Sequence, residues 1–309
     1  MSGYDKVASF DLGSNTLRAL SMDCDSGRRI ADFEKIVRTA DGLLRSGKIG
    51  DETLERVVSA IEEAKRAIDF ESLRRYRAVT TEAVRKASNG REFISAIEER
   101  TSILFDIVSG EEEALLTLKA VGRRLERLGY TDMGYLMADI GGGSTEIAIV
   151  EADGSYISRS FPIGIVTAVQ RHPDPKSLRE SIREDMSDME RFITENLSAL
   201  PRESVFVATA GTPTTVSALK LGMDYTTYDP QKINGTILTP EDLESIHTRL
   251  SAMEPEERDR AVGTGRGDLI SAGIYIYMHL FDMGGFDRCI VVDDGLREGV
   301  AESLCEESG

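Results

Sequence analysis

A glycine-rich acidic turn occurs twice in this chain, and it constrains the fold more than any other feature. The first copy is VASFDLGSNTLRAL (residues 7–20) and the second is YLMADIGGGSTEIAIV (residues 135–150). In each, an apolar strand leads into Asp-x-Gly, a small hydroxylated turn and a second apolar strand. Asp11 thus aligns with Asp139, and Gly13 with Gly141. The repeat predicts two related half-structures with an anion held between them.

Both turns have the composition of a phosphate-binding loop. Glycine lets the backbone approach a ligand closely, and turn N–H groups and hydroxyls can converge on phosphate oxygens. The hydroxyl groups are those of Ser14, Thr16, Ser144 and Thr145. One such hairpin alone is more often an ordinary β-turn, but the second copy favours phosphate binding. Because Asp11 and Asp139 repel phosphate, we expect them to bind or anchor a divalent cation that neutralises it.

Length and charge limit the classes of partner. A chain of 309 residues with 40% apolar residues is long enough for about two domains with real cores. Its net charge of −17, from 37 basic and 54 acidic residues, argues against nucleic acid and anionic membranes as partners. A polyanionic substrate therefore requires a local group of basic side chains.

The cysteines and the start of the chain predict a cytoplasmic protein. Cys24, Cys289 and Cys305 lie far apart without a Cys-x-x-Cys spacing, which predicts a reduced protein without disulfides or a zinc cluster. The first strand begins almost at once and leaves no room for a signal peptide. The longest apolar stretch, at about 270–281, is interrupted by polar residues and is too short to span a bilayer.

Alternating strand and helix patterns predict an α/β protein. Helices are expected over 51–68, 110–128, 176–200, 240–253 and 269–283, and strands over 77–80 and 103–108. Gly129 is expected to end the second helix by adopting a left-handed conformation. For residues 205–219 the pattern predicts a strand, a turn and a helix with Thr212 as its N-cap. For residues 289–300 it predicts a last strand followed by the start of a helix.

Eight motifs in order along the chain resemble the exopolyphosphatase and guanosine pentaphosphate phosphohydrolase (Ppx/GppA) family, within the actin-like and sugar-kinase superfamily. They are DLGSNTLR (11–18), TTEAVRKASN (80–89), SGEEEA (109–114), DIGGGSTE (139–146), FPIG (161–164), ATAGTPTT (208–215), GRGD (265–268) and DGLREG (294–299). The resemblance implies two α/β domains of the ribonuclease H-like type with an active-site cleft between them, in the family's short two-domain form. The expected domains are 1–128 and 129–309, with a last helix at about 297–309 that packs back on the first. A homodimer is left open.

The acidic run SGEEEA has a structural role on its residues alone and a catalytic role by the resemblance. On the residues alone, Ser109 and Glu112 form an S-x-x-E capping box, and acidic residues in a first helical turn complement the helix dipole. The resemblance gives Glu113 the role of general base that activates water. It makes Glu146 a second catalytic carboxylate, and Asp11 and Asp139 the holders of Mg²⁺. The implied phosphate-binding residues are Gly13, Ser14, Asn15, Thr16, Arg85, Gly141, Gly142, Gly143, Ser144, Thr145, Gly211 and Arg266.

Three functions are compatible with these motifs. An exopolyphosphatase that releases terminal phosphate from inorganic polyphosphate is favoured. A guanosine pentaphosphate 5′-phosphohydrolase would use the same loops, and a non-hydrolytic sensor of an alarmone or of polyphosphate would not need Glu113 and Glu146. A sugar kinase of the same superfamily is disfavoured because the cysteine cluster of similarly short kinases is missing. The chain departs from the family at Gly267, where alanine is usual, and this departure bears on substrate preference more than on hydrolysis.

Overall fold

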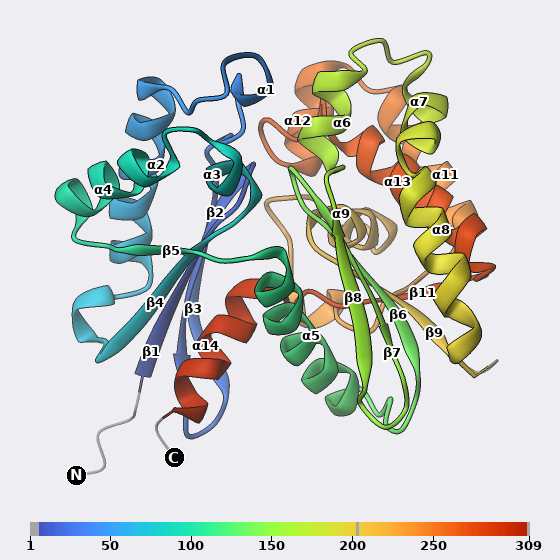
Figure 1. Cartoon of the computed structure of the whole chain (residues 1–309), viewed down its shortest axis with the longest axis horizontal. Helices are drawn as coiled ribbons and strands as arrows, with labels where there is room; N and C mark the ends of the chain where they lie inside the picture. Colours follow the sequence, from blue (N-terminus) through green and yellow to red (C-terminus); the bar gives the residue numbers. More distant parts are fainter. Residues whose placement is uncertain (1–5, 202–203, 308–309) are drawn as a thin grey trace. The chain divides into compact units, whose positions relative to one another are not determined.

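Two α/β units make up the chain, and the computed structural model describes residues 6–201 and 204–307 (Figure 1). The first unit holds the described residues up to Ala120 together with the segment from Gly295 onward, and the second runs from Val121 to Asp294. The boundary between the two units therefore lies inside α5 (Gly110–Arg127). The sequence predicts it between residues 128 and 129, just after this helix ends.

The first unit is built on a five-stranded sheet of order β3-β2-β1-β4-β5. Its strands are β1 (Lys6–Leu12), β2 (Thr16–Asp23), β3 (Arg28–Ile36), β4 (Arg75–Thr80) and β5 (Phe105–Ile107). The first three strands are antiparallel neighbours, while β4 pairs parallel with β1, and β5 parallel with β4. β2 thus runs antiparallel to the other four strands and lies between β3 and β1, so the unit is an α/β domain with a mixed sheet, as expected.

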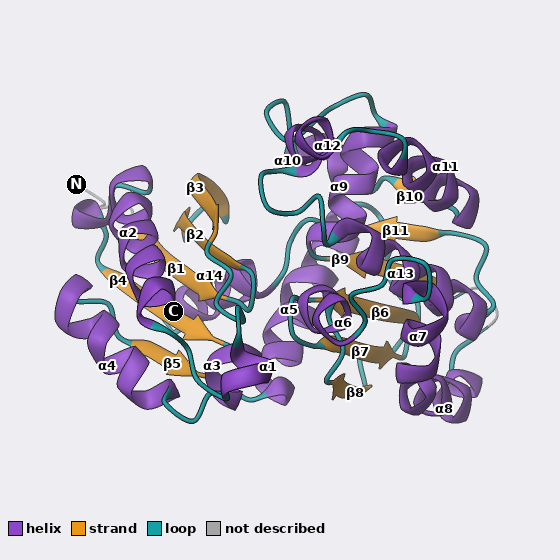
Figure 2. Cartoon of the chain, turned by 90° about the horizontal axis from the view of Figure 1, so that it is seen from above, coloured by secondary structure: helices purple, strands orange, loops and turns teal. Residues whose placement is uncertain are grey.

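Helices cover both faces of the first sheet, which explains why its central strands are apolar on both sides. On β1, Ala8 and Phe10 join the core under α2 (Asp51–Ala67) and α4 (Gly90–Thr101), whereas Val7 packs with residues of α14 (Leu296–Glu306). Figure 2 shows α2 and α4 on one side of this sheet and α14 on the other. The helical segments of this unit are α1 (Leu43–Ser46), α2 (Asp51–Ala67), η1 (Phe70–Ser72), α3 (Glu82–Lys86), α4 (Gly90–Thr101), the first part of α5 (Gly110–Arg127) and α14 (Leu296–Glu306).

The second unit repeats the same sheet with one further edge strand. Its order is β10-β11-β9-β6-β7-β8, in which β6, β7 and β8 form the antiparallel part and β9 and β11 the parallel part. The strands are β6 (Tyr135–Ile140), β7 (Thr145–Val150), β8 (Tyr156–Phe161), β9 (Val205–Thr209), β10 (Ile237–Leu238) and β11 (Cys289–Val291). The two related half-structures predicted from the repeated turn are therefore confirmed.

The helices of the second unit surround α13 (Ile270–Gly284), which packs against α6, α7, α8, α9 and α11. These and the remaining segments are α6 (Ile165–Arg171), α7 (Leu178–Asp185), α8 (Ser187–Asn196), η2 (Leu197–Ala199), α9 (Gly211–Lys220), α10 (Pro230–Ile233), α11 (Pro240–Ser251) and α12 (Pro255–Val262). The single helix predicted over 176–200 is wrong. It is interrupted at Met186, whose backbone (φ −87°, ψ 3°) leaves helical geometry and ends α7.

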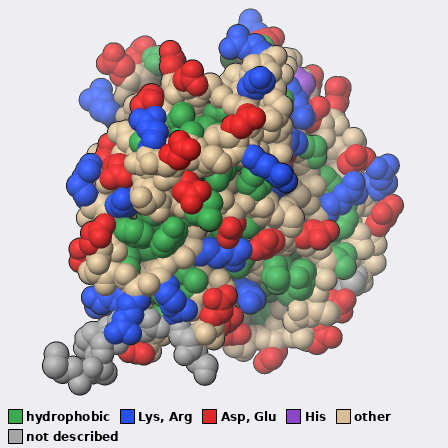
Figure 3. Space-filling view, turned by 60° about the vertical axis from the view of Figure 1, so that its left-hand side comes forward, with side chains coloured by type: hydrophobic (Ala, Val, Ile, Leu, Met, Phe, Trp, Pro, Cys, Tyr) green, Lys and Arg blue, Asp and Glu red, His purple; other side chains and the backbone are tan. Residues whose placement is uncertain are grey.

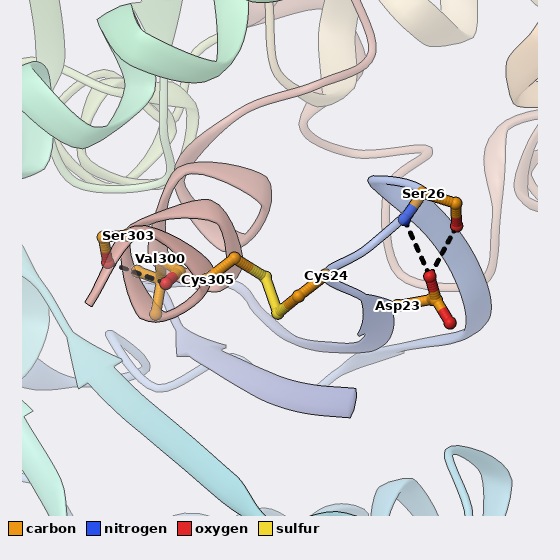
Figure 4. Close-up of a disulfide and its surroundings, with 6 residues drawn as sticks. All are labelled: Asp23, Cys24, Ser26, Val300, Ser303 and Cys305. Atoms are coloured by element: carbon orange, nitrogen blue, oxygen red, sulfur yellow. Dashed lines mark hydrogen bonds between the residues drawn. A yellow bond between two sulfur atoms is a disulfide. The ribbon is translucent and has the colours of Figure 1, made fainter. Parts of the chain in front are cut away.

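The prediction that the cysteines are unpaired is wrong for two of the three. A disulfide joins Cys24, in the turn between β2 and β3, to Cys305, in the last turn of α14 (Figure 4). The partners are 281 residues apart in sequence and meet because α14 packs on β1 and β2, which no local spacing reveals. Cys289 is free and buried, and this burial raises the pKa of its thiol to about 12.

Charged side chains of both signs are interspersed on the face of the molecule in Figure 3. Within the described residues, none of the helices combines the length and the apolar character that a bilayer crossing requires.

Candidate functional site

The two glycine turns close in the same way. The Gly13 N–H donates to the Thr16 carbonyl, and the Gly141 N–H donates to the Ser144 carbonyl, each at 2.9 Å. In each hairpin the aspartate comes two residues before this glycine, near the end of the first strand. The structure therefore places Asp11 and Asp139 at equivalent positions in their two units.

The first turn is held by the chain that follows β3. The Asn15 carbonyl accepts the N–H groups of Val37 and Arg38 at 2.9 and 2.8 Å, and the Ser14 carbonyl accepts the Ala40 N–H at 2.9 Å. Ser14 and Asn15 are buried, and Asn15 Oδ1 has no hydrogen-bond partner among the described residues. A buried amide oxygen without a partner is costly, so this turn is a place where a water or a ligand group fits.

The second turn is held through its carbonyl groups. The Gly141 and Gly142 carbonyls accept N–H groups from the start of α6, donated by Ile165 at 3.0 Å and Val166 at 2.8 Å. Gly164 permits this contact, because a Cβ there would lie 2.6 Å from the Gly141 oxygen. Elsewhere in the turn, the Gly142 and Gly143 N–H groups have no hydrogen-bond partner in the described part of the chain. Such N–H groups are suitable donors for an anion.

The two hydroxylated residues of the second turn, Thr145 and Ser144, make different hydrogen bonds. Thr145 is buried, and its hydroxyl donates to the Ile163 carbonyl at 2.6 Å. This bond ties β7 to the segment before α6, so it gives Thr145 a structural task in addition to the predicted one. Ser144 is 3% exposed and provides the carbonyl that closes the turn.

The two predicted catalytic carboxylates are both buried. Glu146 lies on β7 directly opposite Asp139, and its Oε1 accepts a hydrogen bond from the Ser160 hydroxyl at 2.7 Å. Glu113 lies in the first turn of α5, and its Oε2 is 3.4 Å from Nη1 of Arg85. The structure thus brings together two pairs of predicted site residues, Asp139 with Glu146 and Arg85 with Glu113.

Arg85 is fixed by three acceptors. Besides Glu113, its Nη1 donates to the Val108 carbonyl at 2.6 Å, and its Nη2 donates to Oε2 of Glu82 at 2.7 Å. Glu82 is buried and also pairs with Lys86. Sequence reasoning missed Glu82, although its i, i+3 and i, i+4 spacing to two basic residues of α3 is a recognisable signal.

The capping box predicted at the start of α5 is half formed. The Ser109 hydroxyl accepts the Glu112 N–H at 3.1 Å, which confirms Ser109 as the cap. The Glu112 side chain, however, pairs with Arg77 on β4 instead of returning to the cap. Arg77 competes successfully for this carboxylate, because in an ion pair both the donor and the acceptor are charged, whereas in the capping bond only the acceptor is.

The cap predicted for α9 is wrong. The helix begins at Gly211, so its N-cap is Ala210, and Thr212 is a buried residue of the first turn. Thr212 packs so closely on α13 that a Cβ at Gly273 would lie 2.1 Å from its hydroxyl oxygen. Ala210 has φ 72° and ψ −171°, a conformation that is almost confined to glycine. This strain marks the turn before Gly211 as a candidate functional position.

Arg266 lies in the turn between α12 and α13. Its guanidinium carbon is 5.9 Å from the centre of the Tyr225 ring, which is within the range of a cation–π contact. Of the other arginines in the motifs, Arg18 pairs with Glu34 at 3.0 Å, and Arg297 pairs with Glu298 at 2.7 Å.

The donor chemistry is compatible with magnesium. Among the described residues no three His, Cys, Asp or Glu side chains form a group that could hold a metal by themselves. Mg²⁺ does not need such a group, because it usually takes one or two carboxylates and completes its shell with water and substrate phosphate. Asp139 opposite Glu146 supplies two carboxylates in the second unit, and Asp11 supplies one in the first.

Known proteins share both the sequence and the fold. A sequence model of the Ppx/GppA phosphatase family matches residues 25–307. Exopolyphosphatase 2 of Mycobacterium tuberculosis is 29% identical over 325 residues, which cover 97% of this chain and 98% of that protein.

Two solved structures extend the likeness. The Ppx/GppA family member of Aquifex aeolicus is 27% identical, has a TM-score of 0.73, and covers 99% of both chains. An exopolyphosphatase from Cytophaga hutchinsonii is 22% identical with a TM-score of 0.84 over 98% of each chain, a likeness of fold.

Proposed function

The chain belongs to the Ppx/GppA phosphatase family, and on that premise we propose that it is a phosphoanhydride hydrolase that releases the terminal phosphate of inorganic polyphosphate. The observation that carries the proposal is the repeated hairpin, with a glycine turn and a preceding aspartate in each unit. Phosphoryl transfer depends on positioning and on stabilising charge more than on covalent chemistry, and the second turn supplies N–H donors for that purpose.

Glu113 acts as the general base. Its carboxylate accepts a proton from water while the water oxygen attacks the terminal phosphorus. The bond between this phosphorus and the bridging oxygen breaks, and the shortened chain leaves with that oxygen. The contact between Arg85 and Glu113 supports the assignment, because Arg85 holds the carboxylate in place and is fixed itself by Glu82 and Val108.

Arginines and turn N–H groups stabilise the negative charge of the substrate. Arg85 and Arg266 are the proposed phosphate ligands, since the planar guanidinium binds phosphate through two hydrogen bonds and stays charged. The Gly142 and Gly143 N–H groups are the proposed donors of the second turn. In the second unit, Asp139 and Glu146 would hold Mg²⁺, which would neutralise phosphate oxygens when bound. Asp11 is the proposed Mg²⁺ holder of the first unit.

The deciding experiment compares two substrates. Phosphate release is measured from long-chain polyphosphate and from guanosine pentaphosphate, at matched phosphate concentration and with Mg²⁺. A higher kcat/KM for polyphosphate supports the proposal. A higher value for guanosine pentaphosphate would make the chain a 5′-phosphohydrolase of that nucleotide. Binding of either compound without any phosphate release would make it a sensor, and both results would overturn the proposal.

A further inference from the structure

We propose that Asp259 and Tyr225 are positioning residues for Arg266, and that Gly267 is required for Asp259 to reach its place. The inference rests on the proposed function, in which Arg266 binds phosphate. It concerns the turn of residues 263–268, which connects α12 to α13 (Figure 1), and every contact in it lies within the second unit.

The Asp259 carboxylate clamps the turn on both sides of Arg266. Oδ1 accepts the Gly267 N–H at 3.0 Å, and Oδ2 accepts the Gly265 N–H at 3.3 Å. A carboxylate suits this task because both of its oxygens are acceptors. The Asp259 carbonyl also accepts the Gly263 N–H at 2.9 Å. With the peptides before and after it fixed, Arg266 has little freedom to change its backbone direction.

Gly267 makes the clamp possible. A Cβ at this position would lie 2.4 Å from Oδ1 of Asp259, a separation that real Cβ contacts do not show. An alanine here would therefore displace the Asp259 carboxylate. Gly267 and Asp259 therefore form a matched pair in this chain, because the Gly267 N–H is bonded to the carboxylate that a side chain at residue 267 would displace.

Tyr225 supports the turn and the guanidinium at once. Its ring packs on Gly263, where a Cβ would lie 3.0 Å from Cδ2 of the ring and where φ is +100°. The same ring lies 5.9 Å from the Arg266 guanidinium carbon, and the Tyr225 N–H is anchored on the Ala261 carbonyl at 3.1 Å. A long side chain that is ordered before substrate arrives loses less entropy on binding, which lowers KM.

The test is a double-mutant cycle on polyphosphate hydrolysis with Mg²⁺. Asp259→Asn keeps the volume but turns one acceptor into a donor, so one N–H of the turn loses its partner. We expect it to raise KM about fivefold with kcat nearly unchanged, as for a lost positioning hydrogen bond. In an Arg266→Ala background, Asp259→Asn should leave KM unchanged, because the residue on which it acts is gone.

Two further variants sharpen the result. Gly267→Ala should raise KM as much as Asp259→Asn, and the two changes together should be no worse than either. The matched control is Asp153→Asn, since Asp153 also accepts a backbone N–H, that of Ser155 at 2.9 Å, but in the turn between β7 and β8. It should leave KM unchanged, and the melting temperature of each variant shows whether it is folded.

The outcomes separate this inference from the function on which it rests. A wild-type protein without phosphate release overturns both. An active wild type overturns the inference alone if Asp259→Asn leaves KM unchanged, or raises it equally with and without Arg266. A KM effect that depends on Arg266 and is reproduced by Gly267→Ala supports it.

Discussion

Asp139 on β6 and Glu146 on β7 lie directly opposite each other across the second hairpin, whereas the same places in the first hairpin hold Asp11 and Arg18. Two carboxylates in this relation repel each other unless one is protonated or both share a cation. In the first hairpin the arginine removes this repulsion. The second hairpin is therefore the better candidate for a cation site.

Dependence on a divalent cation is the first prediction. Activity should be lost in EDTA and restored by Mg²⁺, because a polyanion meets carboxylates of its own sign at the proposed site. Asp139→Ala should raise the Mg²⁺ concentration needed for half-maximal rate more than Arg18→Ala does. Phosphate release at the full rate in excess chelator would contradict the prediction.

Loss of the general base is the second prediction. Glu113→Gln should lower kcat by about 10²–10⁴-fold and leave polyphosphate binding nearly unchanged, because the amide cannot accept the proton from water. Glu112→Gln is the matched control, one residue away and paired with Arg77. A Glu113→Gln variant that turns over at the wild-type rate would refute the assignment.

The sequence was sufficient to predict the repeated hairpin, because strand, aspartate and glycine turn are local features that recur in both copies. It could not predict how the turns are fixed. Ser160 reaches Glu146 from a separate strand, and Asp259 reaches Gly267 from the preceding helix. Such contacts depend on packing between elements, and no periodicity encodes them.

The same limit explains the wrong predictions. Thr212 has the residue type of an N-cap, but the helix begins at Gly211, directly after Ala210 in its strained conformation. The pairing of Cys24 with Cys305 follows from the return of α14 to the first sheet. Neither the backbone conformation of Ala210 nor the packing of α14 on the first sheet can be predicted from the local residue pattern.

The third prediction concerns the disulfide. Cys24→Ser should lower the free energy of unfolding by about 2–4 kcal/mol relative to the oxidised protein, because the bond restricts the unfolded chain. Cys305→Ser and the double variant should show the same loss, and a reductant should bring the wild type to their level. Thiol titration of the denatured, unreduced wild type should find only Cys289 reactive. Three reactive thiols there would show that the bond does not form.

A pH-dependent ion-pair cluster gives the fourth prediction. Oε1 of Glu298 accepts hydrogen bonds from Arg29 and Arg297, each at 2.7 Å. Burial opposes ionisation of this carboxyl, but the two guanidinium groups outweigh it and hold the pKa of Glu298 below its ordinary value of 4.5. A lowered folded-state pKa stabilises the protein above the ordinary pKa, and this contribution is lost as the pH falls through the folded-state value.

Glu298→Gln isolates that contribution. At pH 7 it should cost about 3–5 kcal/mol, because it removes the carboxylate that buried Arg297 and half-buried Arg29 share. The difference between wild type and variant in urea unfolding should shrink as the pH falls below 4.5. Other carboxyl groups titrate in both proteins and cancel in this difference. A difference that stays constant down to pH 3 would contradict the lowered pKa.

The last prediction concerns the strained residue before Gly211. Ala210 has φ 72° and ψ −171°, and its carbonyl is held by the Thr214 hydroxyl at 2.9 Å. Such a conformation costs a non-glycine residue about 1–3 kcal/mol, while glycine adopts it freely and loses slightly more entropy on folding. Ala210→Gly should therefore raise the free energy of unfolding by about 1 kcal/mol in urea titrations. Ala218→Gly, in the interior of the same helix, is the control and should lower it by at least about 1 kcal/mol. If both variants lose stability equally, the backbone at residue 210 is not strained in the folded protein.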